Sequence, residues 1–118
     1  QALNHPAATL EVLVSAYRYF FYKSNDAMAR RLALQVMEQV QASEGLPDEW
    51  EQLEAIVRER FYDPPIRLYL SAYTALGGML ARWGAYEAAI EISTHIQSVD
   101  DRNEFGAGVI LNILSPTD

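Results

Sequence analysis

Glu91 and His95 come nearest, in type and spacing, to a set of residues that could bind a metal ion. They are four residues apart, which places them on one face of a helix, and Asp100 and Asp101 follow downstream. One histidine with scattered carboxylates falls short of the ligand set of a typical zinc site. A histidine favoured by the negative end of a helix dipole, followed by an aspartate cap of the next helix, explains the same residues without a metal. The sequence favours this second interpretation, and we predict no metal site.

Other kinds of catalytic site lack their essential residues. The chain has no cysteine, which excludes disulfides, thiolate metal ligands and cysteine nucleophiles. No Gly-x-Ser-x-Gly motif occurs, and the stretch GGMLARWG lacks the Lys-Ser/Thr pair of a phosphate-binding loop. We therefore predict no catalytic residue and no cofactor, and we expect a protein that is not an enzyme.

Charge and hydropathy narrow the range of partners. The 118 residues carry a formal net charge of −7, and an acidic surface repels the phosphates of nucleic acids. Apart from Arg30 and Arg31, the basic residues are scattered along the chain. No apolar run reaches the roughly 18 residues of a membrane-spanning helix. We expect no nucleic-acid partner, no membrane partner and a cytoplasmic location, and the opening Gln1 in place of methionine favours a piece of a longer protein.

Helical periodicity runs along the chain and predicts an all-α fold in one domain over residues 1–118. Six antiparallel helices stacked as helical hairpins are expected, because the connections between them are short. They are expected over residues 6–22, from a cap at Ser24 or Asn25 to about residue 42, and over residues 46–61, 66–83, 85–97 and 103–114.

Proline, glycine and acidic residues mark the expected helix ends. Gly45 stops the second helix in a left-handed conformation, and Pro47 lies in the first turn of the third. Asp63 and Pro64 are expected to be extended, with Pro65 opening the fourth helix. A salt bridge from Asp63 to Arg67 would support that turn.

Residues 70–96 resemble a tetratricopeptide repeat, a helix–turn–helix unit of 34 residues. The matching residues are Tyr73, Leu76, Gly77, Leu80, Gly84, Tyr86 and Ala89, followed by Ile90 and Glu91. Ser93, Ile96 and Asp101 depart from the pattern, and no regular array of repeats is visible. The resemblance implies a small domain similar to an α-solenoid, which serves as a scaffold for protein–protein binding and not as an enzyme.

Two adjacent glycines, Gly77 and Gly78, are the unusual feature of this segment, since each costs a helix interior about 1 kcal/mol relative to alanine. On the fourth helix the expected core stripe is Tyr73, Leu76, Leu80 and Trp83, and Gly77 lies close to it. Gly77 is therefore expected to let the next helix pack closely. Gly78 lies about 100° further round the helix by the 3.6-residue period.

Small residues surround Gly78 and predict a smooth face, which the resemblance places on a concave surface. The expected partner-binding residues are Ser71, Thr74, Gly78, Ala81 and Arg82, with the half-exposed Trp83 and Tyr86 at one end. Packing of Gly78 within the domain is the alternative. The apolar first helix is expected to form an opposite wall or a dimer contact.

The sequence thus favours a non-enzymatic adaptor or chaperone that holds a partner helix or extended segment in a groove. Bacterial secretion chaperones share this general architecture. The alternative is a self-associating structural or regulatory domain of a larger protein, whose partner is a second copy of itself. A small metal-binding protein or enzyme is the remote alternative.

Overall fold

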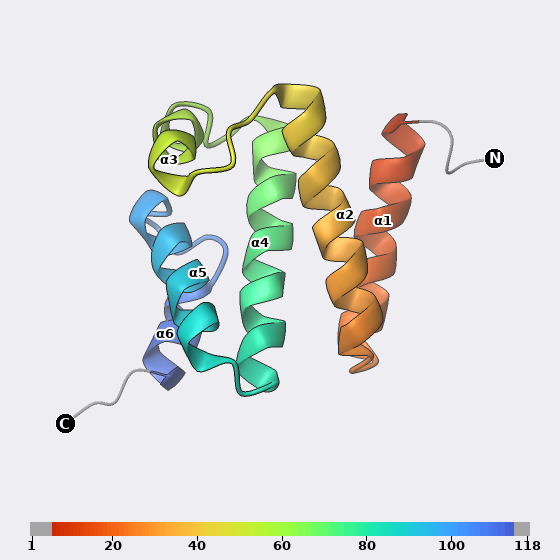
Figure 1. The fold of residues 1–118 in the computed structure, drawn as a ribbon, viewed down its shortest axis with the longest axis vertical. Coiled ribbons are helices and arrows are strands. Elements are labelled where there is room, and N and C mark those ends of the chain that lie inside the picture. The colour runs from red at the N-terminus through yellow and green to blue at the C-terminus, as the bar shows by residue number, and fades with distance from the viewer. Residues whose placement is uncertain (1–5, 115–118) are drawn as a thin grey trace.

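Six α-helices account for most of the chain (Figure 1). The computed structural model describes residues 6–114. The helices are α1 (Pro6–Tyr22), α2 (Asp26–Glu44), α3 (Trp50–Glu59), α4 (Pro64–Arg82), α5 (Tyr86–Val99) and α6 (Ala107–Leu114). Residues 6–114 contain no β-strand, so the expected all-α fold is confirmed.

The four long helices stand side by side in the order α1, α2, α4, α5, and each runs antiparallel to the one before it (Figure 1). The helix α6 returns beside α5 and also contacts α4, while α3 packs against α5 near one end of the stack. The chain therefore forms two helical hairpins, α1–α2 and α4–α5, with α3 inserted in the connection between them. This arrangement confirms the stacked hairpins expected from the short loops.

The turns of the two hairpins have the same backbone hydrogen bonds, related by a shift of 60 residues from Asn25 to Ala85. The amide of Asn25 donates to the carbonyl of Phe20, and the amide of Ala85 donates to that of Leu80, both at 2.9 Å. In each hairpin the second helix then presents a fully buried alanine four residues on, Ala29 and Ala89. The two hairpins are thus structural repeats of each other.

Ser24 is one of the residues that hide this repeat in the sequence. Its φ of 61° is left-handed, as is the φ of 85° at Gly84, the matching position of the second turn. A left-handed conformation favours glycine, so a serine there carries no turn signal. The inserted α3 also breaks the 34-residue spacing that a regular array would have.

The second helix ends as expected, whereas the starts of the next two helices differ from the prediction. The side chain of Asn25 caps α2, and Gly45 ends it with a φ of 65°. Residues 46–49 precede α3, and Pro47 is outside the helix because Gln41 of α2 donates to its carbonyl oxygen at 3.4 Å. Pro64 is the first residue of α4 and is not extended, since the first turn requires no amide hydrogen.

The last helix also begins later than predicted, at Ala107 and not at Asn103. Asp100 and Asp101 do not cap it. Asp100 is 2% exposed, and its carboxylate accepts the amides of Glu104 and Phe105, both at 2.8 Å. These bonds hold residues 100–105 in a turn that precedes α6.

The predicted salt bridge from Asp63 to Arg67 is wrong, because each residue has another partner. Asp63 binds Arg60 at 2.7 Å, and Arg60 also binds Glu44 at 2.6 Å. These two hydrogen-bonded carboxylates raise the pKa of the Arg60 guanidinium. Arg67 binds Glu104 at 2.8 Å, so it ties α4 to the turn before α6.

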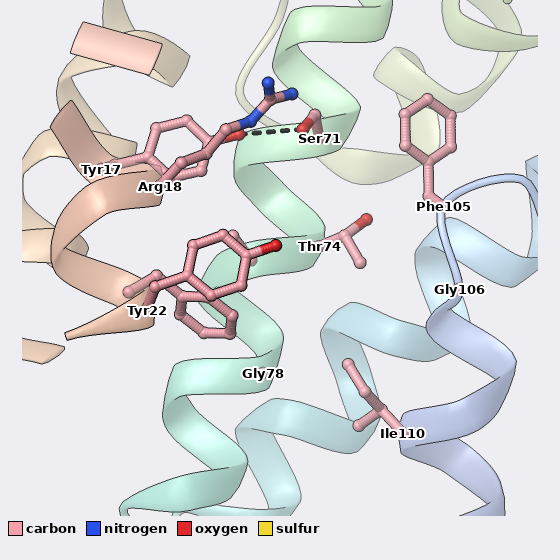
Figure 2. Close-up of a pocket in the computed structure, with 11 residues that line it drawn as sticks. Tyr17, Arg18, Tyr22, Ser71, Thr74, Gly78, Phe105, Gly106 and Ile110 are labelled. Carbon is pink, nitrogen blue, oxygen red and sulfur yellow. Dashed lines mark hydrogen bonds between the residues drawn. The ribbon is translucent and has the colours of Figure 1, made fainter. Parts of the chain in front are cut away.

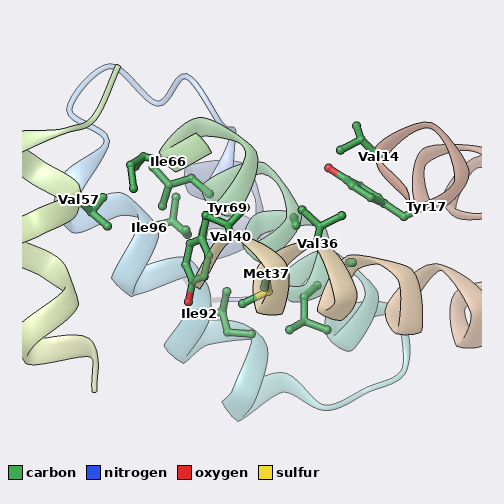
Figure 3. Close-up of a cluster of buried hydrophobic side chains, with 14 of the residues drawn as sticks. Val14, Tyr17, Val36, Met37, Val40, Val57, Ile66, Tyr69, Ile92 and Ile96 are labelled. Atoms are coloured by element: carbon green, nitrogen blue, oxygen red, sulfur yellow. The ribbon is translucent and has the colours of Figure 1, made fainter. Parts of the chain in front are cut away.

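The core lies between α2, α4 and α5 and is closed by α3 (Figure 3). Its fully buried aliphatic side chains come from all four helices: Val36, Val40, Leu53, Val57, Ile66, Leu70, Met79 and Ile96. The core stripe expected on α4 is only partly right, because Leu76 is buried but Trp83 is 47% exposed. The half-exposed position expected for Trp83 is thus the correct one.

Gly77 is buried where α5 crosses α4. A Cβ at this position would lie 3.2 Å from Cγ2 of Ile92 and 3.6 Å from Oγ of Ser93. A contact of 3.2 Å is shorter than ordinary van der Waals packing, so the closeness of the two helices depends on the missing side chain. The interpretation of Gly77 as a packing residue is confirmed.

Candidate functional site

A groove runs along α4 between α1 on one side and α6 on the other (Figure 2). It consists of two adjoining hollows of about 470 Å³ and about 340 Å³, which share Gly78 and Ile110. The first hollow is lined by Tyr17, Arg18, Phe21, Tyr22, Ser71, Thr74, Ala75, Gly78, Phe105, Gly106 and Ile110. The second is lined by Gly78, Ala81, Arg82, Tyr86, Ile110, Ile113 and Leu114.

The floor of the groove is made of small residues of α4. The hydroxyl of Ser71 shares a hydrogen bond of 2.9 Å with the Tyr17 hydroxyl, and that of Thr74 donates to the Leu70 carbonyl at 2.8 Å. Both polar groups are therefore already paired within the domain. At Gly78 an added Cβ would be in ordinary van der Waals contact with Cδ1 of Ile110 and Cζ of Phe21, each at 3.9 Å, so it would fit without a clash. The floor is therefore smooth, and at Gly78 it has room for an added methyl group.

Aromatic residues of α1 form one wall, which is one of the two roles expected for this helix. Tyr17 is buried at 3% exposure and joins the wall to the floor, whereas Tyr22 is 84% exposed at the rim. Figure 2 shows the Tyr22 ring extending from α1 toward Thr74, with Arg18 above the bond between Tyr17 and Ser71. The sequence marked α1 as apolar but did not predict which residues face the groove.

The short helix α6 and the turn before it form the other wall. Residues 105–114 contain no charged side chain, and Ile113 is 74% exposed. The sequence predicted a helix over residues 103–114 but gave it no place in the groove. A helix of eight residues at the edge of the stack buries only one face against its neighbours. Its apolar composition was the signal in the sequence that a second apolar face would be left for the groove.

Six of the seven residues expected to bind a partner line the groove; Trp83 does not. The helix α4 ends at Arg82, and Trp83 lies near α2, where the guanidinium of Arg30 is 5.8 Å from its ring centre. The expected place of Trp83 at the groove end is therefore wrong. The direction of a side chain at a helix end depends on the turn, which periodicity does not predict.

Arg82 lines the groove but is also bound within the domain. It forms an ion pair of 2.6 Å with Asp26, and its guanidinium lies 4.2 Å from the ring centre of Phe21. It thereby connects the end of α4 to the turn between α1 and α2. Its role is to fix the wall of the groove in place, and its charge is already compensated.

The charges of the groove differ from those of the rest of the molecule. Among the residues whose side chains the structure describes, its lining contains Arg18 and Arg82 and no acidic residue. The carboxylates lie on other elements, among them exposed Glu51 and Glu59 on α3 and Glu87 and Glu91 on α5. The described lining of the groove thus contrasts with the net charge of −7 of the whole chain.

Glu91 and His95 do not come together with other carboxylates as a metal site would require. Nδ1 of His95 shares a hydrogen bond of 3.0 Å with the hydroxyl of Tyr73, and the ring stacks on Trp50 at 4.5 Å. Residues 6–114 contain no cluster of three histidine, cysteine or acidic side chains that could hold a metal ion. His95 therefore joins α3 to α4 and α5 through aromatic contacts.

No family model, no curated protein and no solved structure matches this chain. The resemblance of residues 70–96 to a tetratricopeptide repeat therefore stays a prediction from the residues. Among the described helices, none combines the length and the apolar composition that crossing a membrane requires.

Two tyrosines of α4, Tyr69 and Tyr73, are expected to make the protein less stable at alkaline pH. Burial raises the pKa of Tyr69 and of Tyr73 to about 12, compared with about 10 for an unfolded tyrosine. The unfolded chain therefore loses these protons first, and the stability due to their neutral forms is complete below pH 10 and lost between pH 10 and 12. We expect the urea midpoint to fall over this range, and the fall to be smaller in Tyr69→Phe. Tyr62→Phe is the control, because Tyr62 is 66% exposed; an equal fall in both variants would contradict the assignment.

Proposed function

We propose that this protein is a non-enzymatic interaction module that holds a helix or an extended segment of another protein in the groove along α4. The room for an added Cβ on the groove floor at Gly78, between the α1 and α6 walls, is the observation that carries this proposal. A glycine inside a helix lowers stability unless a close approach needs it. The approach at Gly77 is made by α5 of the same chain, whereas at Gly78 the nearest side chains, Phe21 and Ile110, stay 3.9 Å from the position of a Cβ.

The repeated hairpins support a domain similar to tetratricopeptide repeats. The first helices of the two hairpins, α1 and α4, and the following helix α6 all contribute to the groove. In that family the matching side of the first helix lines the concave binding surface. An adaptor or a chaperone, such as those of bacterial secretion, is the role that this geometry supports best, and the lack of cysteine favours a cytoplasmic setting.

Replacement of Gly78 by leucine tests this function directly. The leucine side chain should occupy the floor of the groove, so a partner captured by the wild-type protein from extracts of the source cells should be lost. Ala55→Leu is the matched control, since it adds the same side chain at an exposed site on α3, outside the groove. Binding should be measured quantitatively with the purified partner. Equal affinity of wild type and Gly78→Leu would exclude the groove as the binding site.

Self-association is the second candidate, and exposed apolar side chains on the two outer helices favour it. Val12 and Tyr19 on α1 are 41% and 56% exposed, and Val109 and Ile113 on α6 are 56% and 74% exposed. Terminal helices of a repeat stack usually carry a polar outer face. Light scattering over a concentration series separates the two candidates, because a monomer at all concentrations is compatible only with a different partner.

A further inference from the structure

We infer that the groove selects a partner segment of defined chemistry: an apolar stretch that carries an acidic side chain at one end, placed against Arg18. This inference rests on the proposed function and adds the chemistry of the partner to it. The two ends of the groove differ, and each end is matched by one part of such a segment.

Arg18 makes one end of the groove positive. It is exposed on the α1 wall, and Figure 2 shows its guanidinium next to the hydrogen bond between Tyr17 and Ser71. The other arginine of the lining, Arg82, has its charge compensated by Asp26 at 2.6 Å. No ion pair of Arg18 occurs among the residues whose side chains the structure describes. A guanidinium binds a carboxylate through two parallel hydrogen bonds, which is the contact that this end of the groove offers.

The other end of the groove is apolar. Ile110, Ile113 and Leu114 of α6 face Gly78 and Ala81 of α4 across the second hollow. Burial of apolar side chains there contributes about 25 cal/mol per Å² removed from water. The segment is therefore oriented, with its acidic residue toward Arg18 and its apolar residues toward Leu114.

The net charge of −7 does not oppose this selection at physiological salt. Charges separated by more than about 8 Å are largely screened there, whereas a pair in contact is not. An acidic side chain in the groove meets Arg18 and no carboxylate among the described residues of the lining. A lysine at the same position of the segment would be repelled by Arg18, although the outer surface of the molecule attracts it.

A peptide selection tests this inference and does not require the natural partner. A random 12-residue display library is selected against the wild-type protein and then counter-selected against Gly78→Leu, so that only peptides that need the groove are kept. We expect these peptides to combine apolar residues with one or more aspartates or glutamates. Synthetic copies of the enriched peptides are then titrated by fluorescence anisotropy.

The titration uses Arg18→Gln, with Arg31→Gln as its matched control on α2, outside the groove. We expect Arg18→Gln to weaken the acidic peptides about tenfold, as loss of a charged hydrogen bond does, and Arg31→Gln to leave their affinity unchanged. Both arginines are exposed, and unchanged thermal unfolding confirms that the variants are folded.

Two other outcomes of this experiment are possible. The first contradicts the acidic partner alone, and the second contradicts the groove as well. Groove-dependent peptides that are neutral or basic, or that bind Arg18→Gln as tightly as wild type, refute the acidic partner and leave the groove function standing. If no enriched peptide distinguishes wild type from Gly78→Leu, then the proposed function and this inference both fail.

Discussion

Replacement of Gly77 by leucine should lower the free energy of unfolding by about 3 kcal/mol or more, whereas the same replacement at Gly78 should leave it unchanged or raise it. At Gly77 even the first side-chain atom would lie 3.2 Å from Cγ2 of Ile92, and a β-branched residue in a helix has one preferred rotamer and little freedom to move. At Gly78 the nearest atoms are 3.9 Å away. Loss of a helix-interior glycine there contributes up to about 1 kcal/mol of stability.

Urea unfolding, followed by circular dichroism, measures the free energy of unfolding of both variants. The comparison is direct, because the same side chain is added at two neighbouring positions of one helix. If Gly77→Leu does not fold, Gly77→Ala provides the measurement, with a smaller loss because only the Cβ is added. A large loss for Gly78→Leu would show that Gly78 also packs within the domain. The groove would then be absent, and the alternative that the sequence left open would be correct.

Replacement of Asp100 by alanine should also cost about 3 kcal/mol, because it removes two hydrogen bonds to a charged group. The carboxylate is 2% exposed and accepts the amides of Glu104 and Phe105. Without it these amides lose their partner, and the turn that positions α6 loses its main support. The wall of the groove that α6 provides should then become mobile, so binding in the groove should weaken together with stability.

Asp101→Ala is the matched control for Asp100, since the neighbouring carboxylate is exposed. We expect this control to change the free energy of unfolding by less than about 0.5 kcal/mol. Asp100→Asn retains one oxygen acceptor and should lose about half as much as the alanine variant. A loss of similar size at both positions would show that Asp100 acts only through its charge near a helix end.

Local features of the sequence were sufficient for the helices and for part of the candidate site. Periodicity predicted six helices, and the caps at Asn25 and Gly45 were confirmed. Spacing on α4 separated Gly77 from Gly78 and placed Ser71 and Thr74 on the same side as Gly78. These features depend on residues within a few turns of one helix, and the partner-binding role of this face remains a prediction.

Two of the errors concern the partners of charged side chains. Arg67 pairs with Glu104 and not with Asp63, and Asp100 supports a turn and not a helix start. Glu104 is 37 residues from Arg67, so no local pattern distinguishes it from the other acidic residues. The bonds of Asp100 are local, but a local pattern does not distinguish a carboxylate that caps a helix from one that supports a turn.

The sequence by itself determined that this protein is all-helical, that its helices pair as hairpins and that one of two adjacent glycines packs against the next helix. These properties follow from the 3.6-residue period and from the absence of a Cβ, which act within one element. Only the tertiary structure decided that α1 and α6 close over Gly78 and leave Arg18 at one end of an apolar groove. The physical reason is that a groove is made of surfaces from separate helices, whose relative positions depend on the packing of the whole core.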